Sequence, residues 1–246
     1  MDSSRDSTGR LKGARRAVTA LFVFVAGVAG WLLGRTGATP RAALPVLFAA
    51  PRFNDLLNQD GARVSSAAFR GQVQIVTFLD PYCNALCPVI AAHLVGFENM
   101  LAQTALAHRV EVVAFDIDPA TGPRQMRAFL KQYGWDPRDL HWQFLSGKPG
   151  QIRRIVTGGY HVDYQIVAHA HAGAGSSPAL AAGGSAPQPL VANPLADKAD
   201  VSFNIIHNDI MMVVDGKGRV RRIYDQADAV GAFELLGEVR ALLAVR

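Results

Sequence analysis

Runs of apolar residues divide the chain into elements that predict an α/β domain. Two runs, at 72–79 and 110–117, are rich in β-branched residues and are each closed by Asp-Pro, as is typical of buried central strands. Segments with helical spacing follow both runs and predict helices at 86–105 and 121–133. The other predicted elements are a hairpin around 58–61, a strand at 141–145, a helix at 146–159, an extended segment at 160–166, a strand–turn–strand at 209–224 and an amphipathic helix at 229–245. This alternation predicts a mixed central sheet with helices on both faces.

The longest apolar run, at 17–33, lies near the N-terminus and predicts a transmembrane helix. It carries no charge, and as a helix it is about 25 Å long, close to the thickness of a bilayer core. Five basic residues precede the run, which places the N-terminus in the cytoplasm and the rest of the chain in the periplasm. A cleaved signal peptide is the alternative, but 37–40 is a poor cleavage site. The expected location is therefore the bacterial inner membrane, crossed once.

Composition divides the chain into a tail and anchor at 1–35, a Pro- and Gly-containing linker at 36–47 and one domain at 48–246. Within the domain, about 167–200 is rich in Ala, Gly, Ser and Pro and predicts a flexible insertion, because it cannot bury enough apolar surface to fix its backbone. His169 and His171 in this insertion are interpreted as solvated loop residues in preference to a copper entry site.

The bulk composition excludes some classes of function. Of 246 residues, 50% are hydrophobic and 18% charged, which is enough for one ordinary core. The net charge of +5 is concentrated ahead of the apolar N-terminal run, and no stripe of Lys and Arg with interleaved aromatics supports nucleic-acid binding. Only two cysteines are present, so a disulfide scaffold is not expected.

Those two cysteines, Cys83 and Cys87, join the end of a predicted buried strand to the start of a predicted helix. Amide groups and the helix dipole at such a junction stabilise a thiolate and lower the pKa of a thiol. Three intervening residues in a helical turn place both sulfurs on one face. The thiolate is the form that attacks disulfides and that binds metal, so the pair suits redox or metal chemistry.

Spacing separates these two chemistries. Thioredoxin-type oxidoreductases normally have two residues between their cysteines and a proline before the strand that faces them. Here three residues intervene and His207 precedes the corresponding strand. Two thiolates and one imidazole suit Cu(I) and also hold Cu(II), whereas a closed zinc site usually has a fourth protein ligand. The predicted metal ligands are therefore Cys83, Cys87 and His207.

Three stretches, FRGQVQIVTFLDPYCNALCP, VVAFDIDP and IIHNDIMMVVDGKGRV, carry a wider signal. In these stretches the chain resembles the SCO family of copper chaperones in cytochrome c oxidase assembly. The resemblance implies a thioredoxin-like fold, an N-terminal anchor and a copper site at Cys83, Cys87 and His207. It also implies two kinds of partner, a copper donor and a copper recipient. The recipient is expected to be cytochrome oxidase subunit II, and the chain would either deliver copper to its Cu(A) site or reduce the thiols of that site. The chain departs from the family pattern at Ile206, at 120–123 and in its long insertion.

Three functions compete at this site. A metallochaperone, which is not an enzyme, requires all three ligands. A metal-independent thiol–disulfide oxidoreductase uses only the Cys83/Cys87 pair, which forms a disulfide when oxidised without metal. A peroxidase is disfavoured because Asp80 occupies the position where a Thr or Ser is expected.

Met211 and Met212 are adjacent on a predicted strand and so point to opposite faces, which favours packing over copper binding. Asp116 and Asp118 either orient the site or stabilise the turn that follows their strand.

Overall fold

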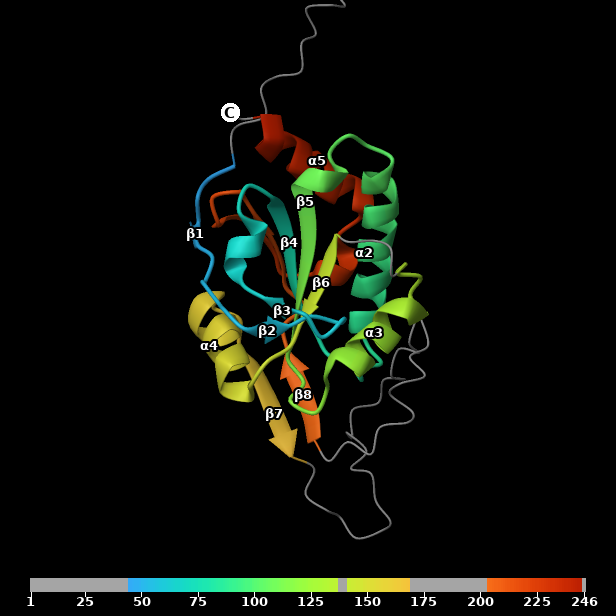
Figure 1. Cartoon of the computed structure of the whole chain (residues 1–246), viewed down its shortest axis with the longest axis vertical. Coiled ribbons are helices and arrows are strands. Elements are labelled where there is room, and N and C mark those ends of the chain that lie inside the picture. The colour runs from blue at the N-terminus through green and yellow to red at the C-terminus, as the bar shows by residue number, and fades with distance from the viewer. Residues whose placement is uncertain (1–43, 137–140, 169–202, 245–246) are drawn as a thin grey trace, which may run out of the picture. The chain divides into compact units, whose positions relative to one another are not determined.

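A six-stranded mixed sheet forms the centre of the domain and positions the cysteine loop at one end of a central strand (Figure 1). The computed structural model describes residues 44–136, 141–168 and 203–244. The strands are β1 (Phe48–Ala49), β2 (Leu56–Leu57), β3 (Arg63–Val64), β4 (Val73–Leu79), β5 (Val110–Asp116), β6 (Trp142–Leu145), β7 (Tyr164–Ala168), β8 (Phe203–His207), β9 (Met211–Val214) and β10 (Arg219–Tyr224). The sheet has the order β1-β10-β9-β4-β5-β6, with β4, β5 and β6 parallel and the other neighbours antiparallel.

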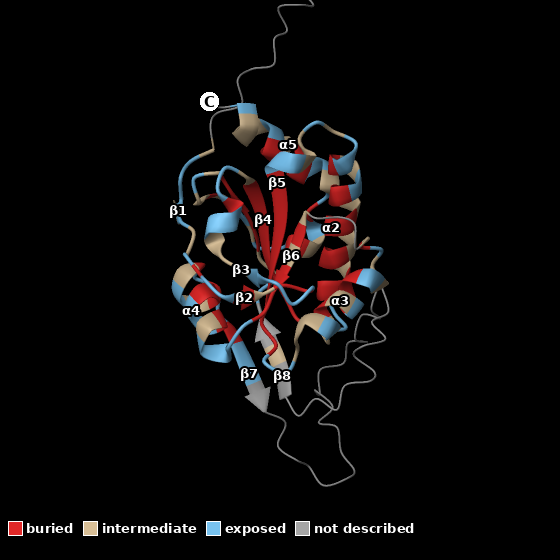
Figure 2. Ribbon diagram, in the orientation of Figure 1, coloured by how far each residue is buried: buried red, intermediate tan, exposed pale blue. Residues whose placement is uncertain are grey.

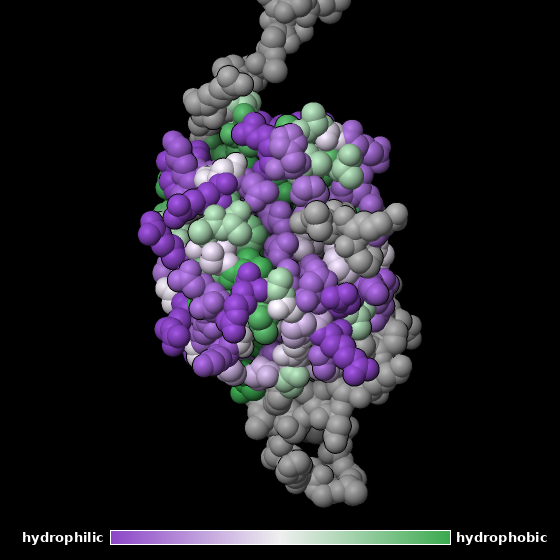
Figure 3. Space-filling view, in the orientation of Figure 1, coloured by the Kyte–Doolittle hydropathy of each residue, from purple (hydrophilic) through white to green (hydrophobic). Residues whose placement is uncertain are grey.

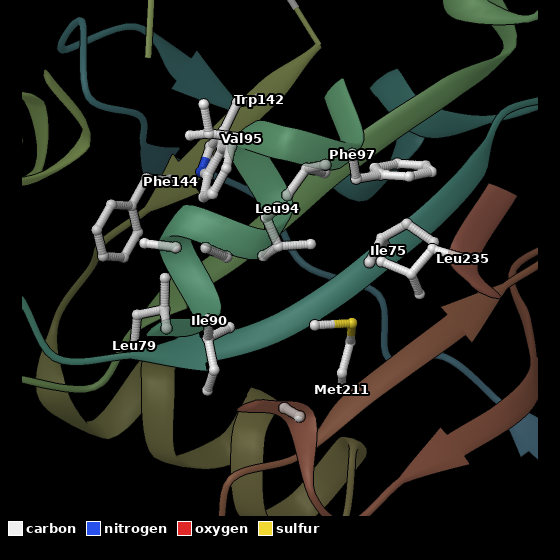
Figure 4. Packing of buried hydrophobic residues seen from close by; sticks show 14 of the residues in the cluster. Ile75, Leu79, Ile90, Leu94, Val95, Phe97, Trp142, Phe144, Met211 and Leu235 are labelled. Carbon is white, nitrogen blue, oxygen red and sulfur yellow. The ribbon is translucent and has the colours of Figure 1, made fainter. Parts of the chain in front are cut away.

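Helices cover both faces of the sheet, as the sequence pattern predicted. They are α2 (Cys87–Ala102), α3 (Pro123–Gln132), α4 (Pro149–Gly159) and α5 (Ala232–Ala244). Side chains of α2, α3 and α5 pack in one buried cluster with one face of the sheet, and side chains of α4 pack in a second cluster with the other face. Figure 4 shows the first cluster, in which Ile90 and Leu94 of α2 lie over β4 and Leu235 of α5 lies beside Ile75.

The two parallel strands β4 and β5 are buried along their whole length, which explains why they lack polar alternation (Figure 2). Within β9, Met211 belongs to one cluster and Met212 to the other, and both are nearly inaccessible to solvent. This confirms that the two methionines pack in the core on opposite faces of the strand.

The predicted hairpin around 58–61 is confirmed and covers the edge of the sheet. It is formed by β2 and β3, and the Gln59 side chain lies against the exposed edge of β6. Gln59 Nε2 donates to the Trp142 carbonyl at 2.8 Å, and the Phe144 amide donates to Gln59 Oε1 at 2.9 Å. The side-chain amide thus satisfies backbone groups that a further strand would otherwise bond.

The helices predicted at 121–133 and 146–159 begin later than expected. The residue before α3 is Gly122, not Thr121, whose hydroxyl instead donates to the Asp116 carboxylate and to the Asp118 carbonyl. The residue before α4 is Lys148, not Ser146, whose backbone forms an extended bridge with Leu57. In both places contacts with a neighbouring strand or loop determine the backbone, which local cap preferences cannot anticipate.

Besides the six-stranded sheet and the β2–β3 hairpin, the described residues form a further two-stranded sheet that was not predicted. β7 and β8 pair antiparallel, with Tyr164 opposite His207 and Ala168 opposite Phe203. The extended segment predicted at 160–166 therefore begins later and continues to Ala168, two residues into the predicted insertion. Positions 169–200 of that insertion, including His169 and His171, lie outside the described residues and the insertion stays a prediction.

The tail and the anchor predicted at 1–35 also lie outside the described residues, as does most of the linker. Among the residues that the structure describes, no helix has the length and apolar character needed to cross a membrane. The anchor at 17–33 therefore stays a prediction.

Candidate metal and thiol site

The loop that carries the cysteines begins where β4 ends, and Asp80 shapes its first turn. The Tyr82 amide donates to the Asp80 carboxylate at 2.8 Å, and the Cys83 amide donates to the Asp80 carbonyl at 3.1 Å. This Asx-type turn reverses the chain directly after the buried strand. Pro88 lies in the first turn of α2, where its missing amide proton costs nothing.

The two thiols are adjacent but differ in their surroundings. Cys87 is the first residue of α2 and is fully buried, whereas Cys83 lies in the loop and is partly exposed. The Ala85 amide donates to Cys83 Sγ at 3.4 Å. Cys83 is therefore the sulfur that a partner or a metal ion reaches first, and it has a backbone donor that stabilises negative charge.

Cys87 does not follow the expectation that this junction lowers the pKa of a thiol. A hydrogen bond with the Cys83 thiol and burial raise the pKa of Cys87 well above its ordinary value, and the nearby Cys83 charge adds to the effect. The hydrogen bond with Cys83 and the burial of Cys87 both oppose the stabilisation of a thiolate that a helix start would provide. The pair thus combines an outer thiol with an inner one that stays protonated until a metal or a disulfide replaces its proton.

Three buried carboxyl groups lie at the same end of the sheet. Asp80 follows β4. Asp116 is the last residue of the parallel neighbour β5 and is opposite Leu79, and Asp118 follows β5. Burial raises the pKa of Asp80 to about 7, and repulsion by Asp118 and Cys83 adds to this. Burial also raises the pKa of Asp116 well above its ordinary value and raises that of Asp118. The sequence indicated Asp116 and Asp118 as candidates, but it gave Asp80 no part in the site.

Tyr133 is a further neighbour that the sequence did not indicate. It follows α3, its ring packs edge-on against Phe129, and its hydroxyl accepts a hydrogen bond from Gln132 at 2.9 Å. Burial raises the pKa of Tyr133 to about 12, and negative charge on Cys83 and Cys87 contributes to this increase. No spacing in the sequence relates Tyr133 to the cysteines, because the contact depends on how α3 packs beside α2.

His207, the third predicted ligand, is the last residue of β8 and its backbone pairs with Tyr164. Its side chain lies outside the described residues. Those residues contain no group of three or more His, Cys, Asp or Glu side chains arranged to hold a metal ion. The structure therefore brings Cys83 and Cys87 together, and His207 as a ligand stays a prediction.

Comparison with known proteins identifies the family. The model of the SCO1/SenC family matches residues 49–177, slightly more than half of the chain. The chain belongs to the SCO1/SenC family. The resemblance found in the sequence is thus confirmed, and the matched region of this SCO1/SenC protein contains Cys83 and Cys87 but ends before His207.

The SCO1 protein homolog of Bacillus subtilis (strain 168) is 30% identical over 92 residues, which are 37% of this chain and 45% of that relative. The match therefore spans less than half the length of the curated relative.

Solved structures confirm the fold. Bradyrhizobium japonicum ScoI with copper bound is similar with a TM-score of 0.57 and 17% identity over 79% of this SCO1/SenC chain and 99% of its own. BsSco is also similar, with a TM-score of 0.57 and 19% identity over 82% of this chain and 98% of its own. It is a member of the Sco family of cytochrome c oxidase assembly proteins, and a disulfide switch is identified in it. The fold is therefore the thioredoxin-like fold of Sco proteins, with the mixed sheet and flanking helices that the sequence predicted.

Proposed function

We propose that this SCO1/SenC protein is an exported, membrane-tethered copper chaperone that carries one copper ion on Cys83, Cys87 and His207. Its partners are a copper donor and a respiratory oxidase, most simply subunit II, whose copper site it loads or whose thiols it reduces. The observation that carries the proposal is the adjacency of two thiols, one partly exposed and one buried, between β4 and α2 of a Sco-type fold.

The donor set suits copper as cargo. Two sulfurs are soft ligands, and an imidazole adds a borderline ligand that stabilises either oxidation state. The raised pKa of Cys87 means that copper must displace a proton from this thiol, so loading is favoured by rising pH. Family membership and a copper-bound relative of the same fold support this choice of metal.

A second function uses the same thiols without metal. The outer Cys83, as a thiolate, attacks a partner disulfide to form a mixed disulfide, and the Cys87 thiolate then displaces the partner's sulfur. The partner leaves as a dithiol with both electrons, and this chain retains a Cys83–Cys87 disulfide. The identified disulfide switch in BsSco supports this alternative, and the two functions are compatible on one pair of sulfurs.

Export and tethering are proposed from the sequence. The uncharged run at 17–33 with basic residues before it favours an inner-membrane anchor with the domain in the periplasm. Protease treatment of spheroplasts tests this location, because a periplasmic domain is digested without membrane disruption. Protection of the domain in intact spheroplasts would contradict it.

Metal analysis of the reduced full-length chain after addition of Cu(I) tests the copper proposal. We expect about one copper per chain and its loss in Cys83→Ala, Cys87→Ala and His207→Ala, since each removes a ligand. His108→Ala is the matched control, because His108 is exposed and is not one of the proposed ligands. Full copper binding in His207→Ala, together with reduction of a disulfide substrate, would favour the metal-independent function. No copper on the parent chain would refute the chaperone.

A further inference from the structure

An open groove with a basic rim lies on the face shown in Figure 3, between the β2–β3 region, the start of α3 and the start of α4. Its volume is about 1330 Å³. Apolar residues including Phe53, Leu57 and Ile155 contribute to its lining. This volume exceeds the roughly 300–1,000 Å³ of pockets for small ligands, so it suits a chain segment better than a single ion.

The charges around this groove are mostly positive. Arg52, Arg63, Lys148 and Arg154 line it, and Asp55 is the acidic residue among them. Asp55 is paired with Arg63 at 3.4 Å, and both side chains remain more than two-thirds exposed. Within the described parts of the chain, the other three cations form no ion pair. The groove thus presents uncompensated positive charge over an apolar floor.

Two helix starts add to this potential. Gly122 and Pro123 at the start of α3 and Lys148 and Gly150 at the start of α4 line the groove. Neither helix has an acidic residue in its first turn or a side-chain cap. The positive ends of the two helix dipoles therefore reinforce the field of the basic side chains.

The groove lies at the end of the sheet that carries the cysteines. Thr121 lines the groove and its hydroxyl donates to Asp116, the last residue of β5. Asp116 pairs in register with Leu79, the residue before Asp80 and the cysteine loop. A partner that occupies the groove is thus held one strand away from the strand that leads to Cys83.

We propose that this groove is the docking surface for an acidic polypeptide segment of the protein that exchanges copper or electrons with the Cys83/Cys87 pair. The role given to the partner rests on the proposed function, whereas the acidic character of the segment rests on the groove. Charge complementarity selects acidic partners and accelerates their encounter. A concave surface with an apolar floor suits a protruding segment of a protein and not the flat surface of a bilayer.

Binding of a fluorescein-labelled octaglutamate peptide to the full-length chain, measured by fluorescence anisotropy at low ionic strength, tests the groove. We expect binding that the triple variant Arg52→Glu/Lys148→Glu/Arg154→Glu weakens by at least about tenfold. The control is Arg109→Glu/Lys131→Glu/Arg240→Glu, which reverses three exposed cations away from the groove lining. Both variants change the net charge equally, so we expect the control to retain affinity within about twofold.

Three results would overturn the proposal. The first is no binding of the peptide to the parent chain, whether or not vesicles of anionic phospholipid bind at the groove. The second is equal loss of affinity in the two triple variants. The third is displacement of the peptide by inorganic phosphate but not by chloride at the same ionic strength, which would assign the groove to a small anion. Copper content separates this test from the proposed function. We expect the groove variant to keep its copper and Cys83→Ala/Cys87→Ala to keep its peptide affinity, so a parent chain without copper leaves the docking result standing.

Discussion

Two turns of this domain begin with an aspartate directly after a buried strand, yet they differ in charge. Asp215 after β9 accepts hydrogen bonds from the Lys217 and Arg219 amides and pairs with the Arg219 and Arg221 guanidinium groups, both at 2.7 Å. Burial alone would raise the pKa of Asp215, but these hydrogen bonds lower it. Asp80 after β4 accepts the Tyr82 amide, but burial raises its pKa to about 7, and its acidic neighbours Asp118 and Cys83 add to the increase.

The difference shows which turn is built for stability. The β9–β10 turn pairs its buried carboxylate with cations, which stabilises the hairpin. The turn before the cysteines retains unfavourable charge at neutral pH, which is common at sites selected for chemistry. The comparison suggests substitutions with opposite effects at the two aspartates.

The largest effect is expected for Asp215→Ala. Because this change leaves the half-buried Arg219 and the mostly buried Arg221 without their shared carboxylate, we expect the free energy of unfolding to fall by about 2–4 kcal/mol. Urea unfolding at pH 7 measures the change. Asp60→Ala is the control, since its pair with Arg127 is more than two-fifths exposed and is worth about 0.5 kcal/mol or less. Equal losses in the two variants would remove the special role of the Asp215 network.

The next effect has the opposite sign. Because the folded chain holds a proton on Asp80 up to about pH 7 while the unfolded chain loses it near pH 4, stability falls as pH rises between these values. Asp80→Asn keeps a hydrogen-bond acceptor for Tyr82 and removes the charge. We expect it to increase the free energy of unfolding by about 1–3 kcal/mol at pH 8 and to change it little at pH 4. A difference that stays constant between pH 4 and pH 8 would show that ionisation of Asp80 is not its cause.

The smallest effect is expected at Thr121. Its hydroxyl donates to the buried Asp116 carboxylate, so Thr121→Val removes one donor to a carboxylate with little change of shape. We expect a loss of about 1 kcal/mol in the free energy of unfolding at pH 8. Thr121→Ser, which keeps the hydroxyl, is the matched control. A similar loss in both variants would assign the effect to the methyl group and not to the hydrogen bond.

The sequence predicts much of this fold because its main signals are local. The apolar runs of β4 and β5, the proline at the start of α2 and the Asp215–Gly218 turn each specify their element from within a short segment. The adjacency of Cys83 and Cys87 follows from their spacing for the same reason. The raised pKa of Cys87 does not follow from the spacing of the cysteines, because it depends on how deeply α2 packs against the sheet.

Other features depend on contacts between distant segments. Tyr133 comes near the thiols through the packing of α3, and the use of the Thr121 hydroxyl depends on Asp116 at the end of a strand. The pairing of β7 with β8 joins segments on either side of the long insertion, and neither segment carries a hairpin signal. Such features arise from tertiary structure, which propensity and periodicity do not encode.

The two sulfurs belong to parts of the protein that differ in how closely they are packed. Cys87 is fixed within a helix whose buried face is close-packed against the sheet, whereas Cys83 is held by a short, partly exposed turn. The two sulfurs are closer together when they are bonded to each other than when both are bonded to a third atom. We expect the movement between these two separations to take place in residues 80–86. We therefore expect that the hydrophobic interior does not repack between the proposed oxidised, reduced and copper-loaded forms, so that a partner would distinguish them by the shape of a single surface turn.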